Sequence, residues 1–346
     1  MIKVDPKHLE AIAGAKKADD LWPIVQGAIR LEFSTIPPYL TAMMSFPVDK
    51  NRVIWSVLHS VVVEEMLHMA IMCNLLNALG GAPEIDSDNF IVQYPSKLPL
   101  SIDEELVVGL EPFSIDLVQN TFMAIEQPEK PLIFKAALAE PSYKTIGDFY
   151  RALKAKILAL GDGALALRNQ FSAPVWYSES RLFPLKDAAA AARAIDLIVE
   201  EGEGTQTSPL ADGGVVAHYY RFQEIVKGHY LVADGNGSFA FSGDVIPFDA
   251  TGVLPITKNQ RLKDIQPETQ GYLRASQFAY SFSKLLSALH ETFNGSPDRF
   301  ESAMSLMFEL KLNGQKLCGE PVLAAGKPST ATYGPCFERV RQEAYS

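Results

Sequence analysis

The stretch that decides the fold is residues 53–81, VIWSVLHSVVVEEMLHMAIMCNLLNALGG. Asp49 or Asn51 can cap a helix at its start. Gly80 and Gly81 end the helix, because glycine adopts the left-handed backbone conformation without a steric penalty. The run is apolar on nearly every face, which is typical of a central helix and not of a surface helix. We therefore expect one long helix in the middle of a helical domain.

Two polar residues lie on an otherwise apolar face of this helix. The face follows the helical spacing of three or four residues and consists of Ile54, Leu58, Val61, Glu65, His68, Met72, Leu75 and Leu79. An unpaired buried carboxylate is costly, so Glu65 needs a cation, a proton or a strong partner. The Glu-x-x-His spacing lets one helix offer a metal ion an oxygen and a nitrogen from the same side. Glu65 and His68 are therefore candidate metal ligands.

The preceding helix, expected from Asp19 to about Met44, supplies a third candidate. Glu32 shares its face with apolar residues and so points inward. In di-metal carboxylate bundles, single glutamates from other helices complete the site that a Glu-x-x-His helix begins. Pro37 and Pro38 are expected to kink or end this helix, since proline has no backbone N–H to donate.

A second half of the site is expected further along the chain. Glu203 in EGEGTQTSP repeats the pattern of Glu32 in LEFSTIPP, an acid followed by a short stretch and proline. His218 lies in the first turn of the next helix, at the height of Glu203 if the two helices are antiparallel neighbours. Glu200, one turn earlier, can face the same layer. Glu201 is the rival, because it follows Leu197 and Ile198 on the apolar stripe of its helix. Periodicity prefers Glu201 but does not settle the choice by itself.

The rest of the chain is expected to be mainly α. Helices are predicted at residues 113–125, 145–160, 187–203, 215–226, 270–293 and 296–312, with loops at 84–112, a small β-hairpin within 228–256 and a surface tail at 319–334. No linker marks a boundary between domains. We therefore expect residues 1–346 to form a single domain.

Composition limits the partners. The chain carries 31 basic and 41 acidic residues, a formal net charge of -10 at pH 7, which argues against binding of nucleic acids or anionic membranes. Its three cysteines form no CxxC pair, and no run reaches the ~18 apolar residues needed to span a bilayer. We expect a cytoplasmic protein whose partners are a small-molecule substrate and further copies of itself.

A metal-free explanation of the buried acids is also open. Glu65 and His68 can form a buried ion pair tied to an arginine, for instance Arg30 or Arg221. Glu200 and Glu203 can be solvated in the last turn of their helix. The helix dipole disfavours acids at that end, and this favours a nearby cation.

Several stretches resemble one known family. They are EFSTIPPYL (32–40), EEMLHMAIMCNLLNALGGAP (64–83), FSIDLVQNTFMAIEQPE (113–129), AIDLIVEEGEGT (194–205), AHYYRFQEI (217–225) and YGPCFE (333–338). Together they resemble the ferritin-like domain family related to iminophenyl-pyruvate dimer synthases, the large enzymes of violacein- and rebeccamycin-type pigment pathways. The pigment enzymes are much longer than this chain, so the dimer-synthase reaction itself is not expected.

The resemblance implies a ferritin-like four-helix bundle core with additional helices, a small hairpin insertion and a metal site. The implied ligands are Glu32, Glu65, His68, Glu200, Glu203 and His218, because the family pattern keeps the first and last acids of EEGEG and not the middle one. One or two iron ions are expected, with manganese as the alternative, since carboxylates and imidazole suit both metals. The expected function is metal binding with oxidation of a small amino-acid-derived substrate. The alternative is a non-catalytic metal-binding or partner subunit.

Overall fold

The computed structural model describes residues 3–101, 106–128, 145–205, 208–211, 213–234, 238–324 and 326–340. In this part of the chain the helices are α1 (Pro6–Gly14), α2 (Trp22–Met44), α3 (Arg52–Ala78), α4 (Ile115–Leu117), η2 (Val118–Phe122), α5 (Met123–Ile125), α6 (Ile146–Leu160), α7 (Ala188–Glu203), α8 (His218–Lys227), α9 (Gln270–Phe293) and α10 (Phe300–Cys318), with short 3-10 turns between some of them. The structure is mainly helical, as the sequence predicts.

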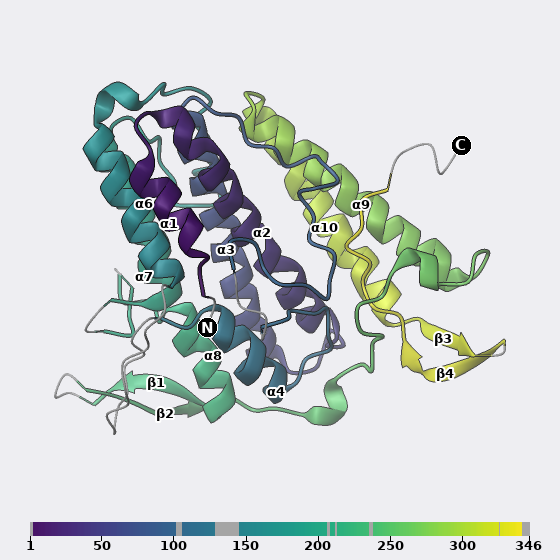
Figure 1. Cartoon of the computed structure of the whole chain (residues 1–346). Coiled ribbons are helices and arrows are strands. Elements are labelled where there is room, and N and C mark those ends of the chain that lie inside the picture. The colour runs from purple at the N-terminus through teal and green to yellow at the C-terminus, as the bar shows by residue number, and fades with distance from the viewer. Residues whose placement is uncertain are drawn as a thin grey trace.

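The long helices lie in pairs around a common core. Figure 1 shows α2 and α3 at the centre, α6 and α7 on one flank, and the hairpin of α9 and α10 on the other. Helix α8 lies below α7, at one end of the bundle. This arrangement buries the faces of α2 and α3 that carry the candidate ligands.

Helix α3 is central, as its apolar sequence predicts. It is long and apolar enough to cross a bilayer, yet 72% of its most apolar stretch is buried inside the protein, as in a central core helix. Asn51 precedes the helix, but its side chain does not cap it as expected, because it forms no hydrogen bond with the first turn. Its amide instead donates to the carbonyls of Asp249 and Gly252, which ties the start of α3 to a distant loop.

Helix α2 runs through Pro37 and Pro38, so the expectation that it could end there is wrong. Proline at position 38 removes the N–H that would bond to the Ser34 carbonyl. The Tyr94 hydroxyl replaces it and donates to that carbonyl over 2.5 Å. A hydrogen bond from another segment thus satisfies the acceptor that proline leaves free, and the helix continues to Met44.

Residues 115–125 form one continuous helix whose middle, Val118–Phe122, is π-helical. Ser114 caps its start by accepting from the Leu117 N–H. A π-turn is rare and occurs most often near functional sites, because its extra residue shifts the side chains that follow. Glu126 is the first residue after this helix.

The strands form two antiparallel pairs at the periphery of the described chain. The pair β1 (His229–Ala233) and β2 (Phe239–Val245) is the hairpin predicted within 228–256. The second pair, β3 (Pro321–Ala324) and β4 (Lys327–Thr332), replaces the predicted surface tail. Gly326 lies between the two strands at a φ of 77°, a backbone conformation that glycine adopts without a steric penalty.

The remaining predicted helices are all present. The last of them, α10, extends past the predicted end at residue 312 to Cys318. Helix α7 begins at the Asp187 cap, whose carboxylate accepts from the Ala190 N–H. Its far end, at Glu203, carries the acids that the sequence associates with the site.

Candidate metal centre

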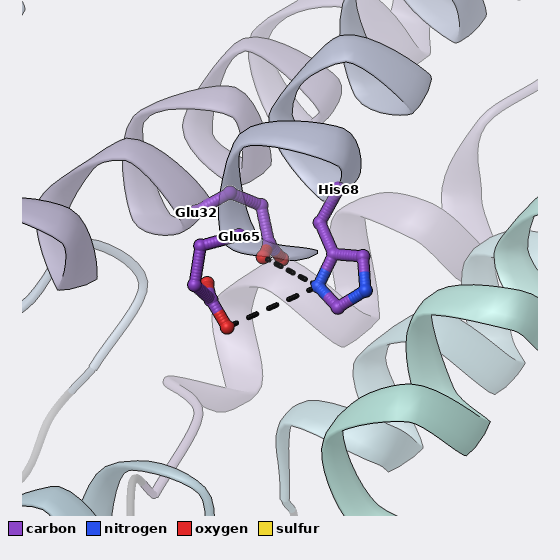
Figure 2. Close-up of side chains that lie close together, drawn as sticks. All are labelled: Glu32, Glu65 and His68. Atoms are coloured by element: carbon purple, nitrogen blue, oxygen red, sulfur yellow. Dashed lines mark ion pairs between the residues drawn. The ribbon is translucent and has the colours of Figure 1, made fainter. Parts of the chain in front are cut away.

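Helices α2 and α3 bring the first three candidate ligands together. Glu32, Glu65 and His68 are all buried, and Figure 2 shows both carboxylates pointing towards the imidazole ring. The His68 Nδ1 atom lies 3.6 Å from Glu32 Oε2 and 4.0 Å from Glu65 Oε1. This is a compact group of two oxygens and one nitrogen, suited to hold one metal ion.

A second group of the same kind lies beside the first. The His218 Nδ1 atom, at the start of α8, is 2.9 Å from Glu65 Oε1 and 3.6 Å from Glu126 Oε2. The rings of His68 and His218 are stacked with their centroids 5.4 Å apart. Both groups use the same oxygen of Glu65, so this carboxylate lies between two candidate metal positions.

Both imidazoles are held from behind by a further carboxylate. His68 Nε2 lies 3.0 Å from Glu201 Oε2, and His218 Nε2 lies 2.9 Å from Glu64 Oε2. A proton on each Nε2 leaves the Nδ1 lone pair directed at the carboxylates of Glu32, Glu65 and Glu126, which we call the inner carboxylates. In metal sites such outer carboxylates fix the orientation and tautomer of the histidine.

Two arginines pair with the carboxylates of Glu201 and Glu64, and Arg181 links the two. Arg181 Nη2 lies 2.6 Å from Glu201 Oε1 and 3.3 Å from Glu64 Oε1. Arg221 Nη2 lies 2.7 Å from Glu64 Oε2. Burial alone would raise the pKa of Glu64, but the bond to His218 and the two arginines outweigh it and lower the pKa to about 2. The outer layer therefore stays ionised at neutral pH.

The inner carboxylates have neutral hydrogen-bond donors on the oxygen that faces away from the histidines. These are Tyr150 on Glu32, Tyr39 on Glu126 at 2.5 Å and Thr35 on Glu65 at 2.8 Å. In each case the other oxygen is the one that approaches a histidine Nδ1. The arrangement fixes three carboxylates so that one oxygen of each is free to bind a cation.

The inner cluster is short of positive charge. Burial and the neighbouring Glu126 raise the pKa of Glu65 to about 7. Burial lowers the pKa of His68, but hydrogen bonds to Glu201 and Glu32 outweigh it and raise the pKa to about 10. The same competition, decided by bonds to glutamates, raises the pKa of His218 well above its ordinary value. Without a metal ion, the positive charges of protonated His68 and His218 offset the negative charges of the carboxylates.

The residues present fit a pair of metal ions. The buried His218 Nδ1 has no hydrogen-bond partner among the described residues, although two carboxylate oxygens lie near it. In the same part of the chain, no lysine or arginine forms an ion pair with Glu32, Glu65 or Glu126. Buried carboxylates without a cation are costly. Three carboxylates and two imidazoles are a donor set suited to iron or manganese.

The three glutamates at the end of α7 have three different positions. Glu203 lines the same cavity of about 50 Å³ as Glu32, Glu65 and Glu126, and its Oε1 accepts from the Gly147 N–H at 3.0 Å. Glu201, the rival at sequence level, lies behind His68. Glu200 is half-buried and is not among the described residues that line the cavity.

Burial raises the pKa of Glu203 to about 7. A side chain on Gly147 would clash with it, because a Cβ there would lie 2.5 Å from Glu203 Oε2. Glu203 is therefore a fourth carboxylate at the cavity, packed against the backbone of α6.

Sequence reasoning missed several residues of the site. Glu126 precedes Pro128 as Glu32 precedes Pro37, and this pattern was a usable signal. Glu64 stands directly before Glu65 and is one of the buried acids of α3. Arg181 lies in a loop, where no periodicity shows which way a side chain points. The metal-free alternative named Arg30 and Arg221 as partners of Glu65. Arg221 pairs with Glu64 instead, and Arg30 donates to the Phe90 carbonyl.

Comparison with known proteins identifies the fold. A family model described as Ferritin-like matches residues 25–227, which is more than half of the chain and includes every residue of the site described above. The chain belongs to this ferritin-like family. Helices α9 and α10 lie outside the matched range.

A solved structure supports the same fold. A ferritin-like protein from Caulobacter vibrioides superposes with a TM-score of 0.58 at 23% sequence identity, over 85% of this chain and 95% of that one. No curated protein matches the sequence. The predicted ferritin-like fold is thus confirmed, and the link to iminophenyl-pyruvate dimer synthases stays a prediction.

Proposed function

We propose that this ferritin-like protein binds a pair of metal ions, iron with manganese as the alternative, in the bundle core. The observation that carries the proposal is that two groups of one histidine and two carboxylates share Glu65. Two buried histidines direct Nδ1 at one shared carboxylate oxygen, Oε1 of Glu65, over 4.0 Å from His68 and 2.9 Å from His218.

Each metal ion would have its own ligands and share one. Glu32 and His68 would hold the first ion, Glu126 and His218 the second, and Glu65 would bridge them. Di-metal carboxylate bundles use four glutamates and two histidines, with two Glu-x-x-His motifs. This chain has one such motif on α3. Glu203 from α7 and His218 from α8 would take the place of the second motif, with Glu203 as the fourth carboxylate.

The finer function that we propose is oxidation of a small amino-acid-derived molecule. A bound iron pair supplies redox chemistry with dioxygen or peroxide. The protein's own residues keep each imidazole in the tautomer that exposes Nδ1 and fix each carboxylate through Thr35, Tyr39 or Tyr150. Ile125, Ile146 and Ile198 line the cavity and limit the access of water. The substrate class is supported by the sequence resemblance.

The second candidate is a non-catalytic metal-binding or partner subunit. It is favoured by the small volume of the cavity beside Glu65, about 50 Å³. Cavities that hold small-molecule ligands usually measure about 300–1,000 Å³. A substrate would need a larger opening than this structure has, whereas metal ions alone need none.

The test is elemental analysis of protein purified without an affinity metal and then reconstituted anaerobically with Fe(II). The variant is Glu65→Gln, which keeps the side-chain shape but removes the bridging charge. Glu10→Gln on exposed α1 is the matched control. We expect close to two ions per chain in the wild type and the control, and a clear loss in Glu65→Gln. Absence of metal from reconstituted wild-type protein would contradict the proposal.

A further inference from the structure

A second, larger cavity lies on the other side of α3 from the metal centre. It measures about 360 Å³ and lies between α2, α3 and the hairpin of α9 and α10, the flank seen in Figure 1. It shares no lining residue with the cavity at Glu65. Its volume falls within the range of about 300–1,000 Å³ that is usual for small-molecule sites.

The walls of this cavity are apolar and adaptable. Methionines and phenylalanines from all four helices and from the loop at residue 171 contribute, among them Met43, Met66, Met304, Phe33, Phe171 and Phe293. Methionine side chains are flexible and polarisable, so they pack against apolar ligands of varied shape. A cavity of this kind suits an apolar chain.

Exposed aromatic residues line the same cavity, and we take them as its mouth. Trp176 is 42% exposed and Phe308 is 57% exposed. Trp55 and His59, on the first half of α3, are stacked with ring centroids 4.8 Å apart. Large aromatic side chains that face solvent beside a hollow are typical of a binding site.

A positively charged side chain, Lys311, lies at this mouth. Lys311 Nζ sits 5.0 Å from the centroid of the Trp55 ring, and Lys311 itself lines the cavity. Among the described residues no carboxylate forms an ion pair with it. Burial and the charge of Lys311 lower the pKa of His59, which leaves its ring neutral and able to donate one hydrogen bond. The only charged side chain among the lining residues is therefore positive, in a protein of net charge -10.

We propose that this cavity binds a monocarboxylate with an apolar chain, such as a fatty acid. The chain lies among the methionines and phenylalanines, and the carboxylate meets Lys311 and His59 at the mouth. The site is independent of the metal centre, because α3 separates the two cavities. Its test therefore does not depend on the proposed function and uses the protein with and without metal.

The probe is dodecanoate, compared with dodecanol and dodecyltrimethylammonium below their micelle concentrations. Two of the three tryptophans, Trp55 and Trp176, line the cavity, so intrinsic fluorescence reports binding. We expect saturable binding of one dodecanoate per chain. Its affinity should exceed that of dodecanol by about fivefold, the scale of one partly exposed charge pair. The cationic amphiphile should bind most weakly.

Two variants separate the head-group contact from the apolar cavity. Lys311→Met keeps the apolar stem and should abolish the preference for dodecanoate over dodecanol. Lys316→Met, on the same helix but outside the cavity, is the matched control and should keep it. Met304→Phe enlarges a wall residue and should weaken all three amphiphiles.

Three results would overturn the proposal. The first is absence of saturable dodecanoate binding to the folded wild type. The second is equal affinity for the three amphiphiles, or a preference that survives Lys311→Met. The third is a stable dimer in sedimentation velocity that Phe308→Asp dissociates, because a second copy of the chain would then cover the mouth.

Discussion

Residues Glu201 and Glu64, the outer layer of the candidate metal centre, give a sharp test, because α7 carries two adjacent glutamates to which we assign different roles. Glu201 Oε2 lies 3.0 Å from His68 Nε2, while Glu200 is half-buried and does not line the cavity. Glu201→Gln replaces an anion by a neutral amide of the same shape. Glu200→Gln makes the same chemical change one residue earlier and is the matched control.

The expected loss follows from the role of Glu201. Removing a carboxylate that orients a metal-binding histidine usually costs about 10- to 100-fold in metal affinity, or about 1.4–2.7 kcal/mol. The free energy of unfolding of the metal-free protein should fall only moderately. Arg181 donates to Glu201 Oε1 through both Nε and Nη2. The glutamine oxygen can still accept these bonds but carries no charge, and Arg181 keeps Glu64 at 3.3 Å and is partly exposed, so a loss of about 1–2 kcal/mol is expected.

The assay is anaerobic Fe(II) titration against a competing chelator, with urea denaturation of the metal-free variants alongside. Glu201→Gln should keep two ions per chain at saturation but bind them more weakly, whereas Glu200→Gln should match the wild type. An equal loss in both variants, or a loss in Glu200→Gln alone, would refute the assignment of Glu201 as the residue that orients His68.

Three further outcomes follow from the structure. Gly147→Ala places a Cβ 2.5 Å from Glu203 Oε2, so the carboxylate must move and lose its hydrogen bond from the Gly147 N–H. The free energy of unfolding should fall by about 1 kcal/mol relative to Gly14→Ala, whose Cβ meets nothing within 4 Å; urea denaturation compares the two variants. In the metal-free protein, burial raises the pKa of Glu203 from 4.5 to about 7, so folding favours its protonated form and stability is lost as pH rises between these values. Glu203→Gln should therefore stabilise the metal-free protein at pH 8 by up to about 3 kcal/mol and leave it unchanged near pH 4, and an equal effect at both pH values would contradict this. Tyr94→Phe should cost about 1–3 kcal/mol, because it unpairs the α2 carbonyl that Pro38 leaves free. Pro38→Ala should reduce that cost in a double-mutant cycle, and full additivity would show that the two residues are not coupled.

Periodicity predicted which polar residues of the long helices point inward. Glu65 and His68 stand out because every other member of their face on α3 is apolar, and Glu32 stands out for the same reason on α2. A helical face is determined by local geometry, so these three positions need no knowledge of the rest of the fold. The structure places their side chains together as that reasoning expects.

The rest of the site depends on how distant segments meet, which local patterns do not determine. Glu126 follows a π-turn, and the extra residue of that turn breaks the regular spacing. At the end of α7 the periodic stripe selected Glu201, and the family pattern selected Glu200 and Glu203. The structure gives Glu201 and Glu203 separate positions, one behind His68 and one at the cavity. Helix ends are where spacing predicts side-chain direction least well.

The fold shows the same division between local and distant effects. The course of α3 could be predicted, because its ends are marked by turn residues. The passage of α2 through two prolines could not, since it depends on the Tyr94 hydroxyl, more than fifty residues away in the sequence. The β3–β4 hairpin was hidden by proline and glycine, which weaken the signal of any strand.

The central claim is that two metal ions lie on either side of Glu65. The most direct measurement is anomalous scattering at the iron edge from crystals of the Fe(II)-loaded protein. We predict two peaks, one beside His68 Nδ1 and Glu32 and the other beside His218 Nδ1 and Glu126. A single peak away from Glu65, or none in crystals of fully reconstituted protein, would contradict the account.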